Sequence, residues 1–308
     1  MLPVVYHPIY SDFPIPDGHR YPLSKYRLLN EYLADNLWPV SVYTPSAIDT
    51  SALKEIHAAE YVDTLLSGSI PLVKMRRIGF PWSNILVTRS LTSLGGTTLT
   101  VDLAIEHGVA IHLTGGYHHA HYDFGSGFCL FNDLVLAANH ALKFENIDKV
   151  LIVDCDVHHG DGTASLTANR ADIITLSVHC EKNFPSRKPD SNIDFPLPID
   201  TDSENYLNAF LPCLRLALAQ HQPDMVIYDA GVDIHHADEL GYLSVCQDGI
   251  SKRDTAVFEA CSAHQVPVAA VIGGGYHTNH TQLIPLHAEL IRAAINTYYP
   301  TTWNTNHD

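Results

Sequence analysis

The sequence predicts an α/β domain in which helices cover both faces of a parallel sheet. Strand-like and helix-like segments alternate along most of the 308 residues. The strand-like segments are uniformly apolar, which is typical of parallel strands buried on both faces. No repeat, low-complexity tract or linker interrupts the alternation, and α/β chains of this size often remain undivided. We therefore expect one domain over residues 1–308.

Runs of apolar residues predict the strands of this sheet. The run at residues 150–153 is the clearest, because four aliphatic residues stand in a row before a polar stretch. In chain order, strands are expected at residues 4–6, 110–113, 150–153, 172–178, 224–228 and 266–272.

Apolar residues at helical spacing predict the helices. Ser51 is the expected N-cap of one helix, and Gly108 is expected to end another. The helices are expected at residues 23–37, 51–66, 88–107, 132–144, 205–220, 249–264 and 281–297. Stretches rich in Pro, Gly or polar residues predict loops at 7–22, 70–83, 115–129 and 181–198.

Composition narrows the class of protein. The net charge of −16, from 34 acidic and 18 basic residues, argues against a nucleic-acid-binding surface and favours cationic ligands. The six cysteines are scattered without a CxxC pair, which predicts neither a disulfide framework nor a thiolate zinc site and fits the cytoplasm. No apolar run approaches ~18 residues, so we expect no membrane-spanning helix. The N-terminus lacks a basic region before an apolar run, so we expect no signal peptide.

The stretch that follows the strand at 150–153 is the strongest indication of chemistry. Within eight positions it contains Asp154, Asp156, His158, His159 and Asp161. Such closely spaced ionisable groups need compensation, and a metal ion provides it because carboxylates and neutral imidazoles are both ligands. Asp156 and His158 are two positions apart, so in an extended chain their side chains point to the same side.

Other polar clusters also follow predicted strands, at the sheet edge where α/β proteins bind ligands. Asp156, His158 and Asp233 could together give one divalent ion three ligands and leave a position for water, as in catalytic sites. This oxygen-rich set favours Zn²⁺ and also suits Fe²⁺ or Mn²⁺. Taken alone, an aspartate at a strand end is more often a capping or salt-bridging residue.

Two further features are candidates for catalysis. His118 and His119 lie in a glycine-rich stretch, and each needs a partner that fixes its tautomer, a role open to Asp154 and Asp161. Tyr276 follows three glycines, and its phenol could donate a hydrogen bond to a developing oxyanion. Taken alone, the histidine pair would be read as exposed to solvent and Tyr276 as a packing residue.

Several blocks of sequence together resemble one known family. In chain order they are Gly115-Gly-Tyr-His-His-Ala120, Ser126-Gly-Phe-Cys129 with Asn132-Asp133, Asp154-Cys-Asp-Val-His-His-Gly-Asp-Gly162, Ala230-Gly-Val-Asp233 and Gly273-Gly-Gly-Tyr276. They resemble the signature blocks of the zinc-dependent histone deacetylases, in that family's order. The compact length, the opening residues and Leu240-Gly-Tyr-Leu-Ser244 look most like the class IV branch and its bacterial members.

The resemblance implies a fold and an activity. The fold is the arginase/deacetylase fold, a parallel eight-stranded sheet between layers of helices. The activity is removal of acetyl or longer acyl groups from lysine side chains by a zinc-dependent deacetylase. The expected partner is an acylated lysine peptide or another acylated amine, with no nucleic acid and no membrane, and the oligomeric state is left open.

The resemblance also implies roles for individual residues. One Zn²⁺ is bound by Asp156, His158 and Asp233, and Fe²⁺ is the alternative. His118 and His119 are a general base and acid pair, oriented by Asp154 and Asp161 respectively, and Tyr276 polarises the acyl carbonyl. Gly127, Phe128 and Phe184 border a channel for the lysine stem. A structural K⁺ is expected near Asp154, Asp156, His158 and Ser177.

The chain departs from the family at the rim of the site. Residues 77–83 hold no clear match for the acidic residue with which many deacetylases grip the peptide backbone.

Three other functions are alternatives. An arginase-like binuclear manganese site is disfavoured because Gly160 stands where a further carboxylate is needed, and two metals in the site would contradict the single-metal interpretation. The chain could instead hydrolyse acetylpolyamines, or bind acyl-lysine without catalysis. His159, His235 and His236 have no assigned role.

Overall fold

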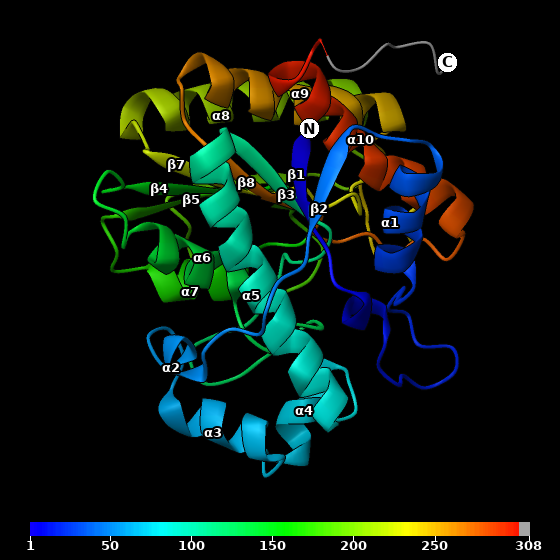
Figure 1. Ribbon diagram of the computed structural model, residues 1–308, viewed down its shortest axis with the longest axis vertical. Helices are drawn as coiled ribbons and strands as arrows, with labels where there is room; N and C mark the ends of the chain where they lie inside the picture. Colours follow the sequence, from blue (N-terminus) through cyan, green and yellow to red (C-terminus); the bar gives the residue numbers. More distant parts are fainter. Residues whose placement is uncertain (302–308) are drawn as a thin grey trace.

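The computed structural model describes residues 1–301, and the last seven residues of the expected domain, 302–308, lie outside the described part. Its centre is one eight-stranded parallel sheet with the strand order β2-β1-β3-β8-β7-β4-β5-β6 (Figure 1). This confirms the predicted parallel α/β architecture. The strands are β1 (Leu2–Val5), β2 (Val40–Tyr43), β3 (Val109–His112), β4 (Val150–Asp154), β5 (Ile173–Cys180), β6 (Ile193–Leu197), β7 (Met225–Asp229) and β8 (Val268–Val271).

Helices cover both faces of the sheet (Figure 1). One face carries α5 (Asn84–His107), α6 (Asp133–Ala141) and α7 (Asp161–Thr167). The other carries α8 (Ser203–His221), α9 (Gln247–Ala263) and α10 (His280–Tyr298), with α1 (Lys25–Asp35) beside α10. The short helices α2 (Thr50–Leu53), α3 (Ala59–Ser67) and α4 (Leu72–Ile78) lie beyond the sheet at the far end of α5, and a 3-10 turn, η1 (Pro8–Ser11), follows β1.

The register of the central strands brings their carboxyl ends to one edge. Every residue of β3, β8, β7 and β4 is buried, which explains their uninterrupted apolar sequences. Asp154 at the end of β4 lies opposite Asp229 of β7 on one side and Ser177 of β5 on the other. Asp229 in turn lies opposite Val271, the last residue of β8. The loops that leave these strands therefore start side by side.

Several predicted boundaries were wrong. The expected loop at 70–83 contains α4, which starts after Pro71 and ends at Gly79 in a left-handed conformation, so these two residues mark the ends of a helix. The expected loop at 181–198 contains β6, whose Pro196 is tolerated because β6 is an edge strand. The expected helix at 51–66 is two helices, α2 and α3. Neither β2 nor α7 was predicted.

None of the helices within residues 1–301 combines the length and the apolar character that crossing a membrane requires.

Candidate active site

A pocket of about 1010 Å³ opens at the carboxyl edge of the sheet. His119, His158 and Tyr276 are among the residues that line it, together with Phe128 and Phe184. These residues come from the loops after β3, β4, β5 and β8, so the pocket lies where the strand order places the loop starts together. The structure thus brings together residues that are widely separated in the sequence.

Asp156, His158 and Asp233 form a compact buried group, and His158 connects this group to the pocket that it lines. One potential ligand atom from each lies within 4.8 Å of the others, and all three side chains are buried. Nδ1 of His158 is 2.8 Å from Oδ1 of Asp156 and 3.2 Å from Oδ2 of Asp233. Asp156 and His158 follow β4, and Asp233 follows the neighbouring β7.

The chemistry of this group fits a divalent cation. Nδ1 of His158 faces two carboxylates but can donate only one hydrogen, and Oδ2 of Asp233 is buried without a hydrogen bond from any described residue. Burial and the negative charge of Asp156 raise the pKa of Asp233 to about 7. Burial alone would also raise the pKa of Asp156, but His118 and His158 outweigh burial and hold that pKa below its usual range. A bound cation would relieve the repulsion between these carboxylates.

The glycine loop, residues 273–275 after β8, lies against the carboxylates of Asp156 and Asp233. The backbone N–H of Gly274 donates to Oδ2 of Asp156 at 2.9 Å. A Cβ on Gly274 would stand 2.2 Å from Oδ2 of both Asp156 and Asp233, closer than any side chain can approach. Glycine is therefore needed at position 274 so that the backbone can reach the carboxylates.

His118 and His119 each contact one aspartate. Nδ1 of His118 donates to Oδ2 of Asp154 at 2.8 Å, and Nδ1 of His119 donates to Oδ1 of Asp161 at 2.6 Å. The two Nε2 atoms are 3.1 Å apart, so they can share one hydrogen. Asp161 also accepts a hydrogen bond from His121, which holds its carboxylate in place. The pairing of histidines and aspartates is the one that the family resemblance implies.

The surroundings of His118 and His119 shift the pKa values of the two imidazoles in opposite directions. Burial would lower the pKa of His118, but Asp154 and Asp156 outweigh it and raise that pKa well above its usual value. Burial and the positive charge of His118 lower the pKa of His119 to about 3. The pKa of His118 is thus shifted upward and that of His119 downward, which favours the neutral imidazole at His119. Only His119 reaches the pocket surface.

Tyr276 lines the same pocket as His119 and His158. Its ring centroid lies 6.2 Å from that of His158 and 6.0 Å from that of Phe128, and its backbone N–H donates to Asp238. Burial and the charges of Asp156 and Asp233 raise the pKa of the phenol well above its usual value, so the hydroxyl keeps its hydrogen. A protonated phenol in this position is a hydrogen-bond donor to the pocket.

Aromatic side chains form the walls of the pocket. The ring of Phe184 packs edge-on to His119 with centroids 4.8 Å apart, and Phe128 packs near Tyr276. Gly127 leaves room for His119, because a Cβ there would stand 2.5 Å from Cδ2 of the histidine. His235 and His236 are not among the residues that line this pocket.

Three residues that the sequence did not single out contact the site or its supporting loops. Lys25 is buried, and its Nζ donates to the carbonyls of Gly273 and Gly275. Arg253 is buried and donates to the carbonyls of Cys155, Ala230 and Gly231. Asp229 is buried next to His118 and Asp154. Asp229 could have been found from the sequence, because it is an acidic residue at the end of a buried strand. Nothing in the helical spacing distinguishes Lys25 or Arg253 from other helix residues.

Replacing Lys25 by methionine is expected to damage the glycine loop. The change keeps the length of the side chain but leaves two buried carbonyls without a donor, so the unfolding free energy should fall by about 2–3 kcal/mol. The turnover number should fall because Tyr276 directly follows Gly275. Urea unfolding and steady-state kinetics measure both effects. Lys252→Met, at an exposed lysine, is the control, and a Lys25→Met protein with unchanged stability and turnover would contradict this role.

Comparisons with known proteins identify the family of this chain. The family model described as the histone deacetylase domain matches residues 19–289. An uncharacterized protein of Picosynechococcus sp. is 44% identical over 299 residues, covering 96% of this chain and 99% of that protein. Histone deacetylase 2 of Arabidopsis thaliana is 28% identical, covering 86% of this chain and 72% of that protein. The acetoin utilization protein AcuC of Staphylococcus aureus is 28% identical, with 77% and 68% covered.

A solved structure supports the fold. The crystal structure of the HDA15 HD domain superposes with a TM-score of 0.79 and 20% identity, covering 96% of each chain. The chain belongs to the histone deacetylase family, which confirms the resemblance read from its sequence blocks. Family membership supports a deacetylase of the hydrolase class, and the buried aspartate and histidine group agrees with the metal dependence of that family.

Proposed function

We propose that this chain is a metal-dependent amidohydrolase that removes acetyl or longer acyl groups from lysine side chains. One observation carries the proposal. A buried ligand group and two histidine–aspartate pairs lie beside one aromatic-walled pocket, which His119, His158 and Tyr276 line. A non-catalytic binding protein would not need this combination, because recognition of a neutral amide requires neither a proton-transfer pair nor a metal site.

Asp156, His158 and Asp233 would hold one divalent ion, which we propose to be Zn²⁺, with Fe²⁺ as the alternative. When bound, the ion supplies Lewis acidity that polarises the amide carbonyl and lowers the pKa of water. The fit rests on Oδ2 of Asp233, which accepts no hydrogen bond from the described residues, and on the position of Nδ1 of His158 between two carboxylates.

The two histidines and Tyr276 divide the remaining chemistry. His119 reaches the pocket, so it accepts the proton of the attacking water, and the histidinium then protonates the leaving amine. Asp161 orients His119, and Asp154 orients His118, whose Nε2 lies 3.1 Å from Nε2 of His119. The Tyr276 hydroxyl donates to the oxyanion that develops on the carbonyl. The products are a free amine and a carboxylate.

The charges around the pocket favour acyl-lysine in a peptide over an acetylpolyamine. Arg20, Arg77, Arg187 and Lys188 line the pocket, and we call these four residues the basic rim. The acidic lining residues are Asp161, which is hydrogen-bonded to two histidines, and Glu239, which accepts from Thr278. The rim is thus basic although the net charge of the chain is −16. A polyamine would bring further ammonium groups to this rim, whereas a peptide with acidic neighbours would be attracted.

Reversing one charge of the basic rim is expected to shift this preference. In Arg77→Glu, kcat/KM for an acetylpolyamine should rise relative to that for an acetyl-lysine peptide with acidic neighbours, by about two- to fivefold, the range for an exposed charge pair. Arg76→Glu is the matched control, because Arg76 is exposed on the same helix but does not line the pocket. Equal shifts in both variants would show that the rim does not select the substrate.

A substrate panel tests the proposed function directly. Acetyl-lysine peptides, long-chain acyl-lysine peptides and acetylpolyamines should be compared by kcat/KM at fixed salt concentration. We expect acyl-lysine peptides to be the better substrates. Preferential hydrolysis of acetylpolyamines would favour a small acylated-amine deacetylase instead, and no hydrolysis of any member by the metal-loaded protein would favour a binding protein.

Three further assignments belong to the same proposal. A monovalent cation, K⁺, would lie near Asp154 and Ser177, which face each other in neighbouring strands. The cytoplasm is the proposed compartment, since the six cysteines, all within the described residues, are free. The class IV branch remains a prediction from the motifs.

A further inference from the structure

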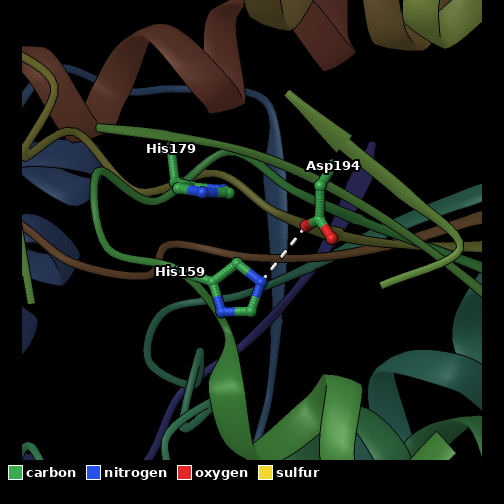
Figure 2. A group of neighbouring side chains, drawn as sticks. All are labelled: His159, His179 and Asp194. Carbon is green, nitrogen blue, oxygen red and sulfur yellow. Dashed lines mark hydrogen bonds and ion pairs between the residues drawn. The ribbon is translucent and has the colours of Figure 1, made fainter. Parts of the chain in front are cut away.

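Another group of potential metal ligands lies near β5 and β6, where β6 is the edge strand of the sheet. Figure 2 shows His159, His179 and Asp194 with their side chains converging on one space. One potential ligand atom from each residue lies within 4.8 Å of the others. Nε2 of His159 is 3.1 Å from Oδ1 of Asp194, and the two imidazole centroids are 4.6 Å apart. His159 follows β4, His179 belongs to β5 and Asp194 to β6, so three neighbouring segments contribute.

We propose that His159, His179 and Asp194 bind a second divalent ion, Zn²⁺, at a site that shares no ligand with the candidate active site. Two imidazoles and one carboxylate are a ligand set that zinc accepts with water in the fourth position. The proposal does not depend on the proposed deacetylase function.

Neighbouring groups orient two of these ligands. Nδ1 of His179 is 3.0 Å from Oγ of Ser177, and by donating there it leaves the lone pair of Nε2 free for a metal. Oδ2 of Asp194 accepts the backbone N–H of Ser191 at 2.7 Å, which leaves Oδ1 facing His159. Ligating histidines and carboxylates in metalloproteins are held by outer hydrogen bonds of this kind.

The position of the group allows both binding and exchange. The side chain of His159 is 1% exposed and that of Asp194 is 26% exposed, so two buried imidazoles meet a carboxylate that solvent can reach. An entering ion would keep a water ligand on the side of Asp194. Because His159 directly follows His158, an ion here would also fix the chain segment that carries a proposed active-site ligand.

Metal content is the direct test, with zinc as the probe. Full-length protein is equilibrated with Zn²⁺ by dialysis at a buffered free concentration, and bound zinc per chain is measured by mass spectrometry. We expect two equivalents in the wild type, one in Asp194→Asn, one in Asp156→Ala and none in the double variant. His179→Gln is the second variant at the proposed site and should also bind one equivalent. Asp190→Asn, at an exposed aspartate in the loop between β5 and β6, should retain two equivalents.

Thermal unfolding gives an independent measurement. Added Zn²⁺ should raise the Tm of Asp156→Ala, which retains the second site, but not that of the double variant, because an ion stabilises only a folded state that binds it.

The inference is wrong if Asp194→Asn and His179→Gln, shown to be folded by circular dichroism, bind as much zinc as the wild type. It is also wrong if the wild type binds one equivalent that Asp156→Ala loses, since the three side chains would then form only a hydrogen-bonded group. A binuclear active site would lose both equivalents in Asp156→Ala and neither in Asp194→Asn. One equivalent that survives Asp156→Ala but not Asp194→Asn would support this site and contradict the proposed active-site metal.

Discussion

The Asp156→Ala variant is expected to lose deacetylation of an acyl-lysine peptide, with kcat/KM reduced by about 10³-fold or more, because a catalytic metal supplies several kcal/mol of transition-state stabilisation. Asp156 contributes a carboxylate that lies 2.8 Å from Nδ1 of His158 and accepts the N–H of Gly274. Its removal therefore disturbs the ligand group and the glycine loop together. Initial rates over a range of peptide concentrations, with zinc content measured on the same samples, test the effect.

Two controls accompany this variant. Asp148→Ala removes an exposed carboxylate just before β4, the strand that precedes Asp156, and should leave activity unchanged. A chelator should abolish activity in the wild type, and Zn²⁺ should restore it. Robust turnover by a preparation shown to be free of metal would contradict the metal-dependent proposal.

Replacing Tyr276 by phenylalanine is expected to lower kcat by about 10²–10³-fold, the usual cost of losing one oxyanion donor. The KM for the same peptide should change much less, because the ring remains and still packs near His158 and Phe128. Only the hydroxyl, which burial and nearby carboxylates keep protonated, is lost. Steady-state kinetics and binding of the uncleaved peptide to the variant separate the two quantities.

Tyr242→Phe is a suitable comparison, because Tyr242 also lines the pocket but is 52% exposed. It should retain nearly full turnover. An unchanged kcat in Tyr276→Phe would refute the oxyanion role, and a rise in KM alone would assign Tyr276 to binding.

The sequence predicted the parallel sheet because its central strands are buried on both faces and carry uninterrupted apolar runs. It failed where local signals are ambiguous. Pro71 and Gly79 favour a loop by their residue types, yet they stand at the two ends of the helix α4. The expected helix at 51–66 is broken before His57, whose ring bonds with the carbonyl of His121 and accepts the N–H of Asn132. These distant contacts override helical propensity and leave no trace in local spacing.

The candidate site followed from its residue types and from the rule that ligands bind at the carboxyl edge of a parallel sheet. The pairing of His118 with Asp154 and of His119 with Asp161 came from the family resemblance, and both contacts are present. The difference between the two histidines could not be predicted, because it depends on which ring faces Asp156 and which reaches the pocket.

Lys25 illustrates a further limit of sequence reasoning. It lies on a helix near the N-terminus and supports carbonyls 248 and 250 positions away. No periodicity or motif connects a single buried lysine to such a distant loop.

The alignment of the strand ends also has a consequence for how the protein is made. Gly274 bonds to Asp156 across 118 positions, and β8, which carries the glycine loop, lies between β3 and β7 in the middle of the sheet. Contacts between such distant segments form slowly, after the costly closure of long loops. The candidate active site therefore cannot assemble on the ribosome until β8 has emerged and inserted between strands made earlier. A nascent or truncated chain that lacks β8 would have neither Tyr276 nor a closed sheet, so activity would report completion of the whole fold.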